Sequence, residues 1–197
     1  MKKIFFIYIF FTFALINNSF AYSSDPKDFI TEIVAEAKNV LIESNSKEYK
    51  TKKLSELALR TVDIKGVAFY TLGKYKKKIN DDQLKEYLDL FEGYFLKTFS
   101  SRLTDYSDPK IDVVEAEILN EKYTIVKSVL IATNKKPQVK IDWRIYTKNP
   151  EKPLIRDLII EGLSLARTEK EQFSSIIESN NGDITKLFDT LREFNAK

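Results

Sequence analysis

The strongest constraint on the fold of this chain is a change in the spacing of its apolar residues near position 110. Between 81 and 103, apolar and aromatic side chains recur every three or four residues, which predicts one long amphipathic helix. The next segments, 111–119, 123–133, 139–147 and 154–165, are rich in β-branched and aromatic residues and are separated by short polar turns. Parallel neighbours need long crossovers, so these short turns predict an antiparallel sheet.

Helices are expected on both sides of this sheet. Asp25 and Pro26 are typical of a helix start, and amphipathic segments follow at 48–60 and 64–72. After the sheet, Thr168 and the residues that follow it fit a capping box, and a last amphipathic helix is expected around Ile184–Leu191. We therefore predict an α+β fold in a single domain. N-terminal helices pack on a twisted antiparallel sheet of about four strands, and C-terminal helices follow.

The first 21 residues have the pattern of a secretory signal peptide. Lys2 and Lys3 precede an apolar run over 4–16, and small residues precede the expected cleavage after Ala21. The apolar run is shorter than the ~20 residues that cross a bilayer, which disfavours a membrane anchor. We expect residues 1–21 to be removed and residues 22–197 to form the mature domain. The chain has no Cys, so this domain has no disulfides, which favours the periplasm of a Gram-negative bacterium.

Charge then argues against nucleic-acid binding. Residues 1–21 hold two of the 32 basic residues and none of the 29 acidic ones, so the mature chain keeps 30 basic and 29 acidic residues. A nucleic-acid-binding domain needs a clustered excess of Lys and Arg. We expect no nucleic-acid partner.

The residue types available also disfavour an enzyme. The chain contains no His and no Cys, which removes the commonest general base, the thiol nucleophile and the usual zinc ligands. Ser164 follows Gly162 in a loose likeness to a nucleophile elbow, but no His is present to activate it. Glu115 and Glu117 are two residues apart, so on a strand they would lie on the same solvent-exposed face. This is a more common arrangement than a catalytic carboxylate pair. We expect no catalytic residue, no metal and no cofactor.

The helix predicted at 81–103 has an unusually aromatic face. Phe91, Phe95 and Phe99 follow one another at intervals of four residues, with Tyr87 one step before them. Such a stripe is most simply part of a filled core. It can equally line an apolar cavity, because an acyl chain needs concave apolar walls and few polar groups. Periodicity alone leaves both possibilities open.

Short motifs along the chain occur in an order that resembles one known family. They are Val62-Asp63, Leu72-Gly73-Lys74-Tyr75, Gln83, Phe91, Leu96, Tyr106, Val126-Lys127-Ser128, Val139-Lys140-Ile141-Asp142, Asp157, Glu161-Gly162-Leu163-Ser164-Leu165 and Gln172-Phe173. Together they resemble the MlaC-type periplasmic phospholipid-shuttle proteins, also called the toluene-tolerance auxiliary family of the ABC phospholipid transport system. The chain departs from the family pattern at Pro153 and Arg156, where aromatic residues are usual.

The resemblance implies a phospholipid carrier that is not an enzyme. Such a carrier buries the lipid tails in an apolar cavity between the helices and one face of the sheet. It exchanges lipid with an outer-membrane lipoprotein–porin complex and with the substrate-binding ring of an inner-membrane ABC transporter, and so serves outer-membrane lipid asymmetry. We expect a monomer. The expected cavity-wall residues are Val67, Tyr70, Leu72, Tyr87, Phe91, Phe95, Phe99, Val126, Ile141, Trp143, Ile145, Leu158, Ile160 and Leu163.

Two other functions compete with this one. The same apolar stripes would also suit a periplasmic interaction or adaptor module with a filled core and no lipid. A hydrolase that uses Ser164 or a carboxylate pair is the third and weakest hypothesis.

Overall fold

The computed structural model describes residues 22–133 and 137–197. The expected signal peptide, residues 1–21, and most of the polar turn expected at 134–137 lie outside this range. The described elements follow one another as α1 (Pro26–Ile42), α2 (Lys47–Thr61), α3 (Ile64–Leu72), the 3₁₀ helix η1 (Gly73–Lys78), α4 (Asp81–Thr104), β1 (Ile111–Asn120), β2 (Tyr123–Leu130), β3 (Val139–Tyr146), β4 (Leu154–Ile160), β5 (Leu163–Ser164), α5 (Leu165–Ser179) and α6 (Thr185–Ala196). The predicted α+β class is confirmed.

Side-chain caps set where the first helices begin. The Asp25 carboxylate accepts hydrogen bonds from the backbone N–H groups of Lys27 and Asp28, and Pro26 occupies the first helical position. At α4, Asn80 accepts from the Gln83 backbone at 2.8 Å, and the Gln83 side chain accepts from the Asn80 backbone at 3.1 Å. This reciprocal pair is a capping box. The helix start predicted at Asp25 is therefore confirmed.

The sheet is antiparallel throughout, in the order β1-β2-β3-β4-β5. The prediction of one strand over 154–165 is wrong, because the chain reverses at Glu161 and Gly162. Both residues have positive φ, at 49° and 82°, which is the backbone of a two-residue hairpin turn. Ile160 therefore pairs with Leu163 across the hairpin, and a two-residue strand joins the four long ones.

Helix α5 has its N-cap at Ser164, four residues before the N-cap expected at Thr168. The Ser164 hydroxyl accepts a hydrogen bond from the Arg167 backbone N–H at 3.0 Å and caps the helix there. Arg167 stands where a capping box would have Glu or Gln, so the sequence signal appeared stronger at Thr168. The first turn of α5 thus follows β5 directly.

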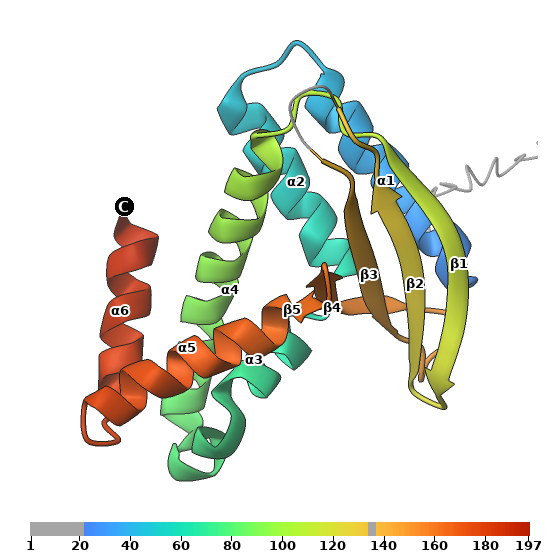
Figure 1. The fold of residues 1–197 in the computed structure, drawn as a ribbon. Coiled ribbons are helices and arrows are strands. Elements are labelled where there is room, and N and C mark those ends of the chain that lie inside the picture. The colour runs from blue at the N-terminus through green and yellow to red at the C-terminus, as the bar shows by residue number, and fades with distance from the viewer. Residues whose placement is uncertain (1–21, 134–136) are drawn as a thin grey trace, which may run out of the picture.

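The helices form two groups around the sheet (Figure 1). Helix α1 lies along β1 and β2, whereas α4 packs between α2 and α6, and α5 runs from β4 at the sheet towards α6. Phe29 and Ile30 of α1, Leu57 of α2, Val126 of β2 and Ile145 of β3 are all buried within a single core cluster. One continuous core therefore joins helices and sheet.

A compact joint fastens the helices to the sheet where α2 ends. Val62 forms a parallel bridge with Ile155 of β4, and the Asp63 N–H donates to the Ile155 carbonyl at 2.9 Å. The Asp63 carboxylate accepts a hydrogen bond from Arg156 at 2.6 Å. It also accepts one from the backbone N–H of Gly66, in the first turn of α3, at 2.8 Å. Asp63 therefore holds β4 and the start of α3 together.

Gly66 leaves room for the Arg156 side chain at this joint. A Cβ atom at position 66 would overlap the Arg156 guanidinium. That guanidinium also stacks on the Tyr146 ring, 4.5 Å from its centroid. Arg156 stands where the family pattern has an aromatic residue. In this chain it forms an ion pair with Asp63 and a contact with the Tyr146 ring.

We expect Arg156→Ala to lower the free energy of unfolding by about 2 kcal/mol, because it leaves the half-buried Asp63 carboxylate without its cation. Urea unfolding followed by circular dichroism measures this loss. Arg192→Ala is the matched control: it breaks the Glu86 ion pair, whose side chains are 47% and 42% exposed, and should change stability little. Equal effects of the two substitutions would contradict the importance of the joint.

Candidate functional site

The sheet presents one continuous apolar face to the helices. Val126 of β2 is the registered neighbour of Trp143, and Trp143 is the neighbour of Leu158. Because side chains on a strand alternate between faces, the same register places all the sheet residues expected in the cavity wall on this face. They are Val126, Ile141, Trp143, Ile145, Leu158, Ile160 and Leu163.

The indole N–H of Trp143 has its hydrogen-bond partner within this face. Its indole Nε1–H donates to the Ser128 hydroxyl at 2.8 Å, and that hydroxyl donates to the Ile141 carbonyl at 2.9 Å. Trp143 is only 9% exposed. A tryptophan bonded in this way keeps its ring fixed and leaves the surrounding surface apolar.

Helix α4 carries a ladder of aromatic rings, which we define as Tyr87, Phe91, Phe95 and Phe99. The ring centroids of Phe91 and Phe95 are 6.2 Å apart, and those of Phe95 and Phe99 are 5.8 Å apart in a nearly parallel stack. Phe173 of α5 meets Phe91 edge-on, so the beginning of the ladder is fully covered. Phe95 and Phe99 are only half-buried and pack against the edge of the core.

Two tyrosines fix α4 to its neighbours. The Tyr87 hydroxyl lies 2.8 Å from the Thr71 hydroxyl, and burial raises the pKa of Tyr87. Tyr94 donates a hydrogen bond to Glu169 of α5, and burial together with this carboxylate raises the pKa of Tyr94. Both phenols therefore stay neutral at any physiological pH and act as hydrogen-bond donors.

The remaining predicted wall residues fall into two groups. Val67 and Leu72 of α3 are buried in the core, with 7% and 1% exposure. Tyr70 is 43% exposed on the outer side of α3, and Leu163 is 60% exposed at the hairpin after β4. In this structure the fold thus brings most of the predicted set together but leaves Tyr70 and Leu163 outside the core.

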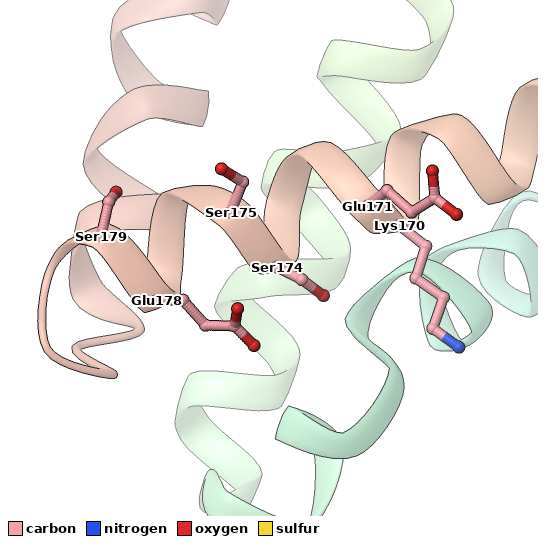
Figure 2. A pocket seen from close by; sticks show the side chains of 6 residues that line it. All are labelled: Lys170, Glu171, Ser174, Ser175, Glu178 and Ser179. Carbon is pink, nitrogen blue, oxygen red and sulfur yellow. The ribbon is translucent and has the colours of Figure 1, made fainter.

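Side chains from the helices and from the sheet belong to one core cluster, where the apolar cavity was expected. Two hollows stand out elsewhere in the described part of the chain. A groove of about 410 Å³ on α5 has a polar lining that includes Lys170, Ser174 and Glu178 (Figure 2). A hollow of about 110 Å³ lies between α3 and α4, at Ala68 and Leu88. Neither matches an acyl-chain site.

The hydroxyl of Ser164 is used in the structure of the sheet–helix turn. Ser164 Oγ donates to the buried Asp157 carboxylate at 2.6 Å while it caps α5. Asp157 also accepts from the Ala166 N–H at 3.0 Å, and Arg144 lies 3.9 Å away. Sequence reasoning missed this role of Asp157, because nothing in the sequence indicates that β4 folds back so that Ser164 and Ala166 return to it.

Among residues 22–133 and 137–197, no three acidic side chains gather as a metal site would require. Within the same residues, no helix is both long and apolar enough to cross a membrane.

Comparison with known proteins gives two findings. The family model described as MlaC protein matches residues 27–193. Among solved structures, the chain is similar to the phospholipid-binding protein from Ralstonia solanacearum in complex with a phospholipid. The TM-score is 0.71 at 20% identity, and the match covers 88% of this chain and 97% of that one. At this identity the likeness shows a shared fold.

We expect Ser164→Ala to lower the free energy of unfolding by about 1 kcal/mol, the usual cost of losing a helix N-cap. Thermal unfolding monitored by circular dichroism tests this. Ser175→Ala is the control, because its hydroxyl is exposed on α5 and caps no helix. If Ser164→Ala left stability at the control value, the assigned capping role would be wrong.

Proposed function

The chain belongs to the MlaC family, and from this premise we propose that it is a phospholipid-binding carrier. The match over residues 27–193 carries the proposal. The shared fold with the phospholipid-bound Ralstonia solanacearum protein supports it. The absence of His and Cys from the sequence agrees with a carrier that performs no catalytic step.

The acyl chains would lie between the half-buried end of the aromatic ladder and the apolar face of the sheet. Phe95 and Phe99 form one side of this space, and Ile141, Leu158 and Ile160 form the other. All five are half-buried, so part of each side chain is available for contacts with a lipid. Each CH₂ group transferred from water contributes about 0.8 kcal/mol, which makes burial of two tails strongly favourable.

Lipid binding would move the two apolar surfaces apart, because residues of both belong to or pack against one core cluster. The beginning of the ladder is held by Phe173 and by the Tyr87–Thr71 hydrogen bond, whereas Phe99 lies two helical turns beyond this anchor. We therefore assign the opening to the C-terminal half of α4. The Asp63–Arg156 joint remains closed during this movement.

The carrier would work in the periplasm after removal of residues 1–21. Its lipid would be exchanged with an outer-membrane lipoprotein–porin complex and with the substrate-binding ring of an inner-membrane ABC transporter. The composition of the sequence supports export, and the family supports the transport role.

A second candidate function is an adaptor module with a permanently filled core. The observation in its favour is the continuous packing between the helices and the sheet. The two candidates differ in one measurable property, which is whether the protein carries a lipid.

We expect organic extraction of the purified protein to release phospholipid, and native mass spectrometry to show the loaded protein. The double substitution Phe95→Asp/Phe99→Asp should reduce the bound lipid at least tenfold, since it places two charges against the acyl chains. The control is Ile118→Asp, at a side chain that is 80% exposed on β1, and it should bind lipid normally.

Circular dichroism identifies variants that fail to fold, and Phe95→Leu then serves as a milder probe of the same wall. Wild-type protein that stays free of lipid after incubation with phospholipid vesicles would contradict the carrier function and favour the adaptor.

A further inference from the structure

Helix α3 and the 3₁₀ helix η1 together are far more basic than the rest of the chain. Residues 64–80 contain five lysines and no acidic residue, although the mature chain is almost balanced in charge. All five lysines are exposed. We call the surface formed by Lys65, Lys74, Lys76, Lys77 and Lys78 the lysine patch.

Aromatic rings connect the lysine patch into one surface. The Lys76 ammonium lies 3.9 Å from the Phe69 ring centroid, and the Lys65 ammonium lies 5.7 Å from it. Lys74 and Lys78 lie 5.2 and 5.4 Å from the Tyr75 ring. The half-buried, apolar ring of Phe69 therefore lies beside the ammonium groups of Lys65 and Lys76.

Helix α5 extends the patch from a distant part of the sequence. Lys170 reaches from α5 towards α3 and η1, as Figure 2 shows, and its ammonium lies 5.1 Å from the Tyr70 ring. A Cβ at Gly73 would stand 2.9 Å from the Lys170 Cε, so the two segments are in close contact. Tyr70, which is 43% exposed, therefore lies within the basic surface.

Few carboxylates neutralise this surface. Glu178 of α5 pairs with Lys74 at 2.7 Å, and Asp89 and Glu92 line a hollow together with Lys65. Among the described residues, Lys76, Lys77 and Lys78 form no ion pair within 4.0 Å. Three adjacent ammonium groups thus remain available to an external anion.

The choice of lysine indicates the kind of anion. Arginine recognises individual carboxylates and phosphates through a planar, bidentate fork, and it is the usual residue at specific protein interfaces. Lysine is a flexible point charge, so a group of lysines suits a surface of many mobile anions. Exposed aromatic rings beside the charges suit the boundary between headgroups and acyl chains.

We propose that the lysine patch docks the protein onto an anionic phospholipid membrane surface. Phe69 and Tyr70 lie at the headgroup level, and the lysines contact the lipid phosphates. The proposal deepens the proposed carrier function, because a carrier of membrane lipids must approach a membrane. It is separate from the acyl-chain site, which is formed by the C-terminal half of α4 and the sheet.

The test is sedimentation of the purified protein with vesicles of pure phosphatidylglycerol or pure phosphatidylcholine. We expect binding to phosphatidylglycerol that is lost at high salt, and little binding to phosphatidylcholine. Lys76→Gln/Lys77→Gln/Lys78→Gln should weaken binding about 100-fold, at about fivefold for each lysine. The control, Lys47→Gln/Lys148→Gln/Lys152→Gln, makes the same charge change at exposed lysines elsewhere and should bind normally.

A second variant separates this proposal from the carrier function. Phe95→Asp/Phe99→Asp should lose its bound lipid yet still sediment with phosphatidylglycerol, and the lysine variant should keep its bound lipid. Equal binding by the two lysine variants would overturn the proposal. So would absence of wild-type binding to phosphatidylglycerol, in which case an acidic protein partner becomes the occupant of the patch.

Discussion

The arrangement of the molecule depends on the joint at which Asp63 meets β4. Its backbone bonds to Ile155, and its carboxylate binds Arg156 while it caps α3. This joint fixes the start of α3 on the sheet, and α4 and α5 pack on α3 in turn. A partly buried ion pair that also satisfies a helix end sets geometry more than it adds stability.

This fixed joint has a consequence for the proposed lipid site. Close to the joint and to Phe173, the aromatic ladder is covered from several sides, and little movement is available. Farther along α4, the Phe95 and Phe99 side chains remain half-buried. The proposed opening would move these two half-buried rings away from the sheet while the core around Tyr87 and Phe91 stays folded. The lysine patch lies on another surface, so the proposed membrane contact leaves the aromatic ladder free.

The sequence predicts those features that rest on local chemistry. The caps at Asp25 and Asn80, the long aromatic helix and the antiparallel order of the strands all follow from spacing and turn residues. Sequence reasoning failed where distant residues decide the conformation. The fold-back after Ile160 places Ser164 and Ala166 on Asp157, and this contact moves the start of α5. Likewise, the sequence shows Arg156 only as a departure from the family pattern. Its ion pair with Asp63 becomes visible only in the folded structure. Whether the space beside the ladder is hollow cannot be read from periodicity, because core and cavity walls share the same spacing.

The central claim is that acyl chains lie between the aromatic ladder and the sheet. The single tryptophan of the chain, Trp143, is on that sheet face and can report on it directly. The decisive measurement is quenching of its fluorescence by phospholipids that carry bromine on the acyl chains, compared with phospholipids brominated on the headgroup. The account predicts strong quenching by the acyl-chain label and weak quenching by the headgroup label. Bound lipid that leaves Trp143 unquenched with either label would contradict it.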